Sequence, residues 1–509
     1  MSNIHLNTRV KKLDDYKVIS RIFGTGYLRK IDKIIQFKHK NCWLLVNTYF
    51  AKDVLETSNP QGLSLLEIFT EPIPFIVFLK KISNKFKINF SHPKEGDLEK
   101  LATLFAAARQ FIKYRFVVKE SFNEYRQLEE MRKEFIEKPQ CLSVAYIIPS
   151  LDCNFRCPGC FIYRKSWEKK HSGTMRPEVF DHMHEFIMRF LPKHLPIEFS
   201  YIFYGGEPLL NKPFIEYASH RIQVLKSEGV YGKLKPRLGI VTNGSLIDED
   251  SIRIFKKYHI IVSISLDGVG ASNDANRIFP GGIGTFKTVL KGIRLLEDAK
   301  VKYGLSWTIG PSNIDSTARD IKWVVKHLKT REISFNIMQD MNGNLSQKME
   351  ESKYFKKMHR IYDVLRENNI IEGRLMRYRF AGKKRSTLLP YPFYCAAVGG
   401  GQFVLRPDGK IGICHAGLMQ REEQWQTPEQ IIDIFHDPVY LKWFARTPVF
   451  IKKCYQDCNY FSLCAGGCAY QVEKATGSMY DRIKNVCMVE RFFMERAIIE
   501  DHSEKSKKS

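Results

Sequence analysis

The sequence predicts an α/β protein organised around a partial (βα)6 barrel, with a smaller α/β module before the barrel and a cysteine-rich region after it. In the middle of the 509-residue chain, short apolar runs alternate with amphipathic patterns of helical length. Cysteine, glycine and acidic residues follow the first four of these runs. Seven of the twelve cysteines are gathered in residues 395–487. Each observation predicts one part of this fold.

The central block contains six candidate strands rich in Ile, Val, Phe and Tyr. They lie at 142–149, 197–204, 237–242, 260–266, 303–309 and 332–338. Helical patterns separate them, at 177–191, 212–228, 247–257, 285–299 and 315–328. Strands that alternate with helices predict parallel βα units, and six such units fit an incomplete barrel.

The unusual residues of this block come directly after its strands. Cys153 follows the first strand, Gly205-Gly-Glu-Pro208 the second, Thr242-Asn-Gly244 the third and Asp267-Gly268 the fourth. A single loop of this kind could simply be a turn. Because the carboxyl ends of barrel strands meet at one rim, four such loops in succession predict an active site there.

The flanking segments differ in pattern. Before the barrel, strand-like runs at 34–37 and 43–46 precede amphipathic patterns at 75–86 and 97–114, and a closing strand is expected at 116–118. After it, a helical pattern at 350–368 leads to the cysteines, and the polar end from Ser503 is expected to be disordered. The expected divisions are an N-terminal module at 1–119, a linker helix at 120–141, the barrel at 142–345, a bridging region at 346–394, a cysteine-rich domain at 395–490 and a C-terminal tail at 491–509.

Composition limits the function classes. The net charge of +25 suits nucleic acid or an acidic peptide, or lysines spread over a solvated surface, and the lack of a long Arg-rich arm favours the last. Residues 1–16 lack the apolar core of a secretory signal, and no apolar run reaches transmembrane length. We therefore expect a cytoplasmic protein with no membrane partner, whose clustered cysteines bind metal. Cys42 and Cys141, outside the clusters, are expected to be small buried residues.

Cys153, Cys157 and Cys160 have C-x3-C-x2-C spacing. Three thiolates can hold three irons of a [4Fe–4S] cluster and leave the fourth open to a substrate or cofactor. The alternative is zinc, but a structural zinc site needs four ligands, and His171 is the nearest candidate for the fourth. The spacing therefore favours a cluster with an open iron.

The C-terminal cysteines exceed what a small core needs. They are Cys395, Cys414, Cys454, Cys458, Cys464, Cys468 and Cys487, with glycines at 399–401 and 409. Iron–sulfur clusters are favoured here too, and zinc with His415 as an added ligand is the alternative.

At these residues the chain resembles the radical S-adenosylmethionine (SAM) superfamily with a C-terminal SPASM domain, over about residues 142–490. The resemblance implies a radical SAM partial barrel, a SPASM domain with two auxiliary clusters, and three [4Fe–4S] clusters in all. It implies SAM as cofactor and a flavodoxin or ferredoxin type of electron donor. By this resemblance Cys153, Cys157 and Cys160 hold the cluster that binds SAM.

The resemblance also assigns cofactor contacts. Gly205, Gly206 and Glu207 match the motif that receives the methionine amino group of SAM. The residues that match polar positions near its ribose and carboxylate are Asn243, Ser265, Asp267 and Arg277. One departure is Gly159, where the family usually has an aromatic residue before the third cysteine. No residue is assigned as a catalytic acid or base.

Family usage also divides the C-terminal cysteines. It places Cys395, Cys414 and Cys468 on the first auxiliary cluster, and Cys454, Cys458, Cys464 and Cys487 on the second. The first then has an iron without a protein thiolate, which is open to a substrate thiolate, a non-Cys ligand or water. Three residues separate Cys454 from Cys458 where the family has two.

The family's common activities are modifications of proteins and peptides. In strand and helix order, the N-terminal module resembles the winged-helix-like domains that bind the leader of a precursor peptide by adding a strand to a sheet edge. We therefore expect a maturase of a ribosomally made peptide that forms a thioether or carbon–carbon crosslink. The alternative is formylglycine formation by a sulfatase-maturase-like enzyme, whose Asp after the second SPASM cysteine is His415 here. Nucleic acid is not expected as a partner, since no RNA-binding module is recognisable. A simple electron carrier would not need the Gly-Gly-Glu-Pro loop.

Overall fold

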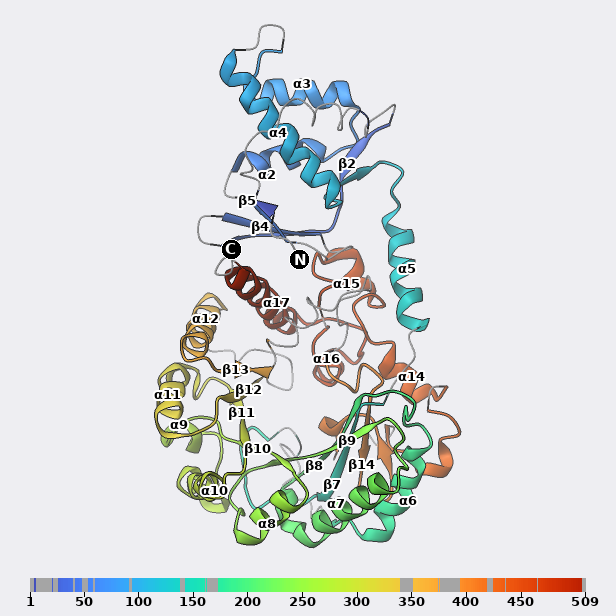
Figure 1. Cartoon of the computed structure of the whole chain (residues 1–509), viewed down its shortest axis with the longest axis vertical. Helices are drawn as coiled ribbons and strands as arrows, with labels where there is room; N and C mark the ends of the chain where they lie inside the picture. The colour runs from blue at the N-terminus through green and yellow to red at the C-terminus, as the bar shows by residue number, and fades with distance from the viewer. Residues whose placement is uncertain are drawn as a thin grey trace.

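The structure is a computed structural model in which a large mostly parallel sheet forms the lower part and a smaller α/β region the upper part (Figure 1). It describes residues 4–5, 21, 26–39, 42–47, 54–57, 60–90, 94–137, 142–160, 162, 173–338, 351–373, 375, 394–418, 424–434, 436–464 and 466–505. Cys141 and His171 lie outside these ranges.

Six parallel strands form the centre of the large sheet, as predicted. They are β7 (Val144–Ser150), β8 (Glu198–Gly205), β9 (Lys235–Thr242), β10 (Ile261–Ser265), β11 (Tyr303–Ile309) and β12 (Glu332–Ile337). Neighbours in the chain are neighbours in the sheet, and each pair is parallel. The connecting helices are α6 (Pro177–Met188), α7 (Lys212–Ser227), α8 (Glu249–Lys257), α10 (Phe286–Asp298) and α11 (Ile314–His327), with the short α9 (Ala271–Asp274) after β10. These helices match the predicted ranges because each carries an apolar stripe toward the sheet.

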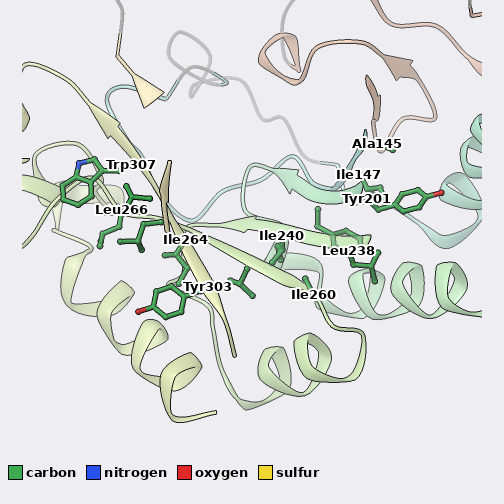
Figure 2. Packing of buried hydrophobic residues seen from close by; sticks show 14 of the residues in the cluster. Ala145, Ile147, Tyr201, Leu238, Ile240, Ile260, Ile264, Leu266, Tyr303 and Trp307 are labelled. Carbon is green, nitrogen blue, oxygen red and sulfur yellow. The ribbon is translucent and has the colours of Figure 1, made fainter. Parts of the chain in front are cut away.

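The main core lies between the strands and these helices. Figure 2 shows Ile147 of β7, Tyr201 of β8, Ile240 of β9, Ile264 of β10 and Trp307 of β11 in this layer. Burial alternates along the strands, so the other sheet face carries the half-buried residues, among them Ser265, Ser306 and Thr308. The helix-covered face therefore stabilises the fold, and the polar opposite face is available for a ligand.

The sheet is larger than predicted, with nine strands in the order β13-β12-β11-β10-β9-β8-β7-β14-β15. At one end β13 (Ile371–Glu372) pairs in parallel with β12. At the other, β14 (Gln402–Leu405) pairs in parallel with β7, and β15 (Ile411–Gly412) is antiparallel to β14. The cysteine-rich region therefore begins on the edge of the central sheet, where it covers backbone groups that β7 would otherwise expose.

The N-terminal region has its own sheet and core. Its sheet order is β1-β5-β4-β3, with β1 (Ile4–His5), β3 (Ile34–His39), β4 (Cys42–Asn47) and β5 (Val54–Thr57). Helices α2 (Pro60–Leu66), α3 (Phe75–Phe86) and α4 (Glu95–Lys113) and the 3-10 turn η1 (Glu67–Phe69) bury Phe69, Phe78 and Phe111 against it. The strand β6 (Val117–Lys119) does not close this sheet as expected. It pairs instead with β2 (Leu28–Lys30), and α5 (Glu124–Glu137) follows it.

The C-terminal region is mostly helical. After α12 (Glu351–Glu367) it contains 3-10 turns η4 (His415–Gly417) and η6 (Pro428–Gln430), then α14 (Pro438–Phe444), α15 (Lys452–Asp457), α16 (Ala469–Thr476) and α17 (Lys484–Lys505). The last helix differs from the expected tail at 491–509, because it crosses residue 490 and packs Phe492 and Phe493 into the main core. Residues 506–509 lie outside the described ranges. None of the helices in the described part of the chain has the length and apolar character needed to cross a bilayer.

Candidate SAM and iron–sulfur sites

The three cysteines of the first motif lie together in the loop after β7. Their side chains are half-buried, and none of them forms a disulfide. Desolvation raises the pKa of Cys153 to about 12, and the charges of Glu207, Cys157 and Cys160 add to the rise. Burial also raises the pKa of Cys157, while the nearby Arg277 guanidinium lowers it. The thiols are therefore close enough to repel one another as thiolates, which a bound metal would relieve.

The donor set suits a cluster better than a single ion. Among the described residues, no three His, Cys, Asp or Glu side chains are arranged around a position for one metal ion. A [4Fe–4S] cubane has four irons, so its ligands are spaced more widely than the ligands around one metal ion. Three cysteines on one loop, none of them in a disulfide, are the ligands that such a cluster takes.

Gly205 and Gly206 bring the end of β8 directly against the start of the cysteine loop. The Gly206 amide donates to the Ser150 carbonyl at 3.1 Å, and the Glu207 amide donates to the Asp152 carbonyl at 2.8 Å. Gly205 has a φ of 126°, which disfavours any other residue. A Cβ on Gly206 would lie 2.5 Å from the Asp152 carbonyl carbon. Both glycines are therefore required by a close backbone approach beside Cys153.

Glu207 is fully buried and joins two strand ends. Its carboxylate accepts hydrogen bonds from the Leu209 amide at 3.1 Å, the Thr242 hydroxyl at 2.6 Å and the Asn243 amide at 2.8 Å. Desolvation raises its pKa to about 7, against the lowering effect of these three donors. The first of them caps the 3-10 turn η2 (Pro208–Asn211). Glu207 therefore positions the rim, and its charge acts on the Cys153 thiol.

Asn243 links the third rim loop to the cysteine loop. The side-chain Nδ2 of Asn243 donates to Asn154 Oδ1 at 2.8 Å, and Asn154 Nδ2 donates to Ser245 Oγ at 2.9 Å. The Ser245 hydroxyl closes the network by donating to Asn243 Oδ1 at 2.7 Å. Sequence analysis did not single out Asn154 or Ser245. The available signal was a polar residue inside the cysteine motif itself.

Asp267 and Arg277 form a buried ion pair. The distance from Arg277 Nε to Asp267 Oδ2 is 2.9 Å, and Asp267 also accepts from the Thr308 amide at 2.7 Å. Burial of Arg277 lowers its pKa, but the negative charges of Asp267, Cys157 and Cys160 outweigh this effect, so the pKa of Arg277 is raised. The Nε and Nη2 side of Arg277 therefore faces Asp267, and its positive charge acts on the Cys157 thiol.

The segment after Arg277 also holds the cysteine loop. The Arg156 amide donates to the Ile278 carbonyl at 2.7 Å, and the rings of Phe155 and Phe279 lie edge to face at 4.9 Å. Ser265 ends β10 and is half-buried opposite Ser306. The structure thus gathers the predicted cofactor residues at one rim.

The side chain of Met338, which directly follows β12, fills the space next to Gly159. A Cβ on Gly159 would lie 2.8 Å from Met338 Cε, and a Cβ on Gly310 would lie 3.0 Å from Met338 Sδ. The side chain from the last central strand therefore occupies the space that a larger residue at 159 would need.

The seven C-terminal cysteines fall into two electrostatic groups. Cys454 is influenced by Cys487 and Cys458, and Cys464 by Cys454 and Cys487. In the other group, Cys468 is influenced by Cys395, while Cys395 and Cys414 both act on Tyr146. Burial is the main cause of the raised thiol pKa values, to about 12 for Cys454 and about 11 for Cys468. None of the seven is in a disulfide, and seven thiols are a donor set that suits clusters.

Three rings lie between the first motif and the nearer C-terminal cysteines. His415 lies 4.6 Å from the ring of Tyr146 and 4.9 Å from that of Tyr204. Desolvation lowers the pKa of His415 to about 4, so its imidazole is neutral at pH 7. Burial raises the pKa of Tyr204, and the charges of Cys160 and Cys414 add to this rise. The two tyrosines were not predicted, although their strand positions place them on the face opposite the helices.

Comparisons with known proteins agree with this geometry. Residues 147–324 match the family model of the radical SAM superfamily. The chain is 25% identical over 335 residues to a cysteine-type anaerobic sulfatase-maturating enzyme of Clostridium perfringens, covering 63% of this chain and 86% of that protein. It is 24% identical over 405 residues to the radical SAM cyclopropyl synthase TigE of Paramaledivibacter caminithermalis, covering 76% of this chain and 81% of that protein.

Solved structures show the same fold. The structure titled native anSMEcpe with bound AdoMet has a TM-score of 0.57 at 21% identity and covers 70% of this chain and 98% of its own. Streptococcus suis SuiB bound to S-adenosylmethionine has a TM-score of 0.50 at 14% identity and covers 90% of this chain and 99% of its own. Residues 147–324, with the cysteine loop at the rim of the sheet, form a radical SAM domain, and the relatives that match this chain are radical SAM enzymes.

Proposed function

We propose that the protein is a peptide maturase that abstracts a hydrogen atom from a ribosomally made precursor and forms a thioether or carbon–carbon crosslink. Cys153, Cys157 and Cys160 would hold the [4Fe–4S] cluster whose open iron binds SAM. When bound, this pair supplies a 5′-deoxyadenosyl radical, formed with one electron from a flavodoxin or ferredoxin. The chain's own residues position the cofactor and exclude water from it.

The rim residues have distinct roles in this proposal. The Gly205–Gly206 backbone offers close approach, and Glu207 offers its remaining lone pairs to the ammonium group of SAM. Asn243 and Ser265 border the ribose, while the Asp267–Arg277 pair fixes a positive charge beside Cys157. Arg277, in an ion pair with Asp267, would bring its guanidinium to the SAM carboxylate.

The C-terminal cysteines would hold two auxiliary [4Fe–4S] clusters in a SPASM domain at 395–490. Cys454, Cys458, Cys464 and Cys487 supply four ligands to one, and Cys395, Cys414 and Cys468 supply three to the other. The support is the pattern of mutual charge effects, which follows the same division. The incomplete set leaves a position that suits a substrate thiolate.

The observation that carries the peptide assignment is the N-terminal region packed on the cysteine-rich region. Lys33 Nζ donates to the Gln456 carbonyl at 2.5 Å, and Asn459 Nδ2 donates to the Ile34 carbonyl at 3.0 Å. Ile35 and its cross-strand partner Val46 share a core with Leu463. A small module with its own core is thus attached beside the second group of cysteines, as Figure 1 shows for β4 and α15.

One edge of this module's sheet suits an extended peptide. The chain itself pairs β1 with β5 at one edge, and β3 forms the other edge. An edge strand presents unpaired backbone groups to which a peptide strand can add. The net charge of +25 favours an acidic leader. We infer that residues 1–119 bind the leader along β3 beyond Ile34, whose carbonyl already accepts from Asn459.

Sulfatase-type oxidation of a Cys or Ser to formylglycine is about as well supported. The similarity to cysteine-type sulfatase-maturating enzymes carries it, over 86% of their length. Those matches leave over a third of this chain uncovered, whereas the S. suis structure matches 90% of it.

Anaerobic turnover separates the two activities. The purified enzyme is given short peptides encoded beside its gene and, in parallel, a Cys-containing sulfatase peptide, and the products are read by mass spectrometry. A crosslink removes two hydrogens from the precursor, whereas formylglycine formation from Cys removes the sulfur. Sulfur loss from the sulfatase peptide without any change in the encoded peptides would replace the maturase assignment with the alternative.

A further inference from the structure

Arg446 lies fully buried between the two groups of C-terminal cysteines. It follows α14 and is 0% exposed. Its Nε donates to the Met479 carbonyl at 2.9 Å, and its Nη1 donates to the carbonyls of Gly466 at 2.5 Å and Gly467 at 3.2 Å. No ion pair with a carboxylate includes Arg446 among the described residues, unlike the buried Arg496, which contacts Glu500 and Asp363.

Two glycines bring the guanidinium to the cysteines. Gly466 and Gly467 have φ values of 76° and 68°, and any side chain at Gly466 would overlap Arg446. The Gly466 amide donates to Cys464 Sγ at 3.1 Å, and Cys468 directly follows Gly467. The same short segment therefore contacts Arg446 through its carbonyls and carries one cysteine of each group.

The largest negative charges that act on Arg446 are those of cysteines. Desolvation lowers the pKa of Arg446, and the charges of Cys454, Cys464, Cys468 and Cys395 oppose this. The first two cysteines belong to one group and the last two to the other. A buried cation without a compensating charge costs several kcal/mol, and carbonyl dipoles offset only part of it. Metal-bound thiolates at Cys464 and Cys468, at either end of the segment that Arg446 contacts, would supply that charge.

We propose that Arg446 is the shared counter-charge of both auxiliary clusters and raises the reduction potential of each. The proposal rests on the cluster content given above. A reduced cluster carries one more negative charge than the oxidised one, so a fixed cation in a low-dielectric site stabilises the reduced form. Removing two hydrogens from a substrate releases one hydrogen atom, one proton and one electron. A higher potential favours acceptance of that electron by the auxiliary clusters.

The test is a redox titration of the reconstituted full-length protein followed by electron paramagnetic resonance. Arg446→Gln should lower the midpoint potentials of both auxiliary clusters and leave that of the SAM-binding cluster in place. Arg446→Lys keeps the charge and should keep potentials close to the wild type. Arg496→Gln is the matched control, since it removes a buried arginine paired with carboxylates and should not change any potential.

Iron content separates this inference from the cofactor assignment. A wild-type protein with only about four irons would remove the auxiliary clusters themselves. Wild-type potentials in Arg446→Gln at full iron content would overturn the role of Arg446 alone, as would an equal shift in Arg496→Gln. If Arg446→Gln loses iron, retention of both clusters in Arg446→Lys supports the charge, and loss in Arg446→Lys as well contradicts it.

Discussion

A single added methyl group at Gly206 should disturb the backbone contact beside the SAM site and so lower both the stability of the protein and its affinity for SAM. A Cβ there would lie 2.5 Å from both the Asp152 carbonyl carbon and the Leu151 carbonyl oxygen, all of them backbone atoms. Contacts below 3.0 Å are essentially never observed for Cβ atoms. The two segments must therefore separate by at least about half an ångström, a shift that rigid close-packed backbone resists.

The energetic cost follows from the contacts that are lost. Overpacking costs about 1–3 kcal/mol, and each weakened backbone hydrogen bond adds about 1 kcal/mol. Two such bonds are involved, from the Gly206 amide to Ser150 and from the Glu207 amide to Asp152. We expect Gly206→Ala to lower the unfolding free energy by about 3–5 kcal/mol. Because the shift falls next to Cys153, SAM affinity should fall as well.

Chemical denaturation and calorimetric SAM titration measure these two effects. Gly96→Ala is the matched control, since a Cβ on Gly96 meets nothing within 4 Å. It should leave SAM affinity unchanged and be neutral or slightly stabilising in helix α4. Equal stability and equal SAM affinity of the two variants would refute the close-approach argument.

Three further predictions concern other parts of the molecule. Burial raises the pKa of Glu207 from 4.5 to about 7, so the folded apoprotein holds this proton more tightly than the unfolded chain. The contribution of this proton to stability, on the order of 3 kcal/mol, is present below pH 4.5 and lost as pH rises to about 7. Chemical denaturation of Glu207→Gln across that range should show no such loss of stability. A pH profile identical to that of the wild type would contradict the raised pKa of Glu207. Removing residues 1–118 should weaken precursor binding while slow uncoupled SAM cleavage remains. Because the deletion uncovers Leu463 and Met494, iron content is measured to check that the rest of the protein stays folded. Unchanged precursor affinity would remove the leader-binding role. The substrate should carry a Cys that meets the incomplete cluster; if every precursor Cys can be replaced by Ser or Ala and the product still loses two hydrogens, a carbon–carbon or ether bond is formed instead.

The central strands and helices could be predicted from sequence because buried parallel strands and amphipathic helices leave strong periodic signals. The added strand β14 could not, since four residues at 402–405 specify a strand only once β7 offers an open edge. For the same reason β6 was predicted as a strand but with the wrong partner. The apolar residues of α17 belong to the core because the helix packs on α12, where the rings of Tyr362 and Phe492 are in contact. The sequence pattern of α17 alone does not show this partner.

The grouped cysteines and the rim motifs were visible in the sequence as spacing, but the contacts that their side chains make in the fold were not. Sequence suggested that Glu207 meets the cofactor, whereas the structure also uses it to join the ends of β8 and β9. Arg277 was expected to face a ligand carboxylate and is paired with Asp267. Arg446 carries no motif, and its position between two groups of cysteines depends on the tertiary packing of segments far apart in the chain.

Iron content and SAM cleavage in one matched pair of proteins test the central claim most directly. The pair is the wild type and a variant with Cys153→Ala, Cys157→Ala and Cys160→Ala, both reconstituted anaerobically. Three cubanes predict about twelve irons in the wild type and about eight in the variant, with 5′-deoxyadenosine formed only by the wild type. Stoichiometric zinc with about four irons in the wild type, or 5′-deoxyadenosine formation by the variant, would contradict the account.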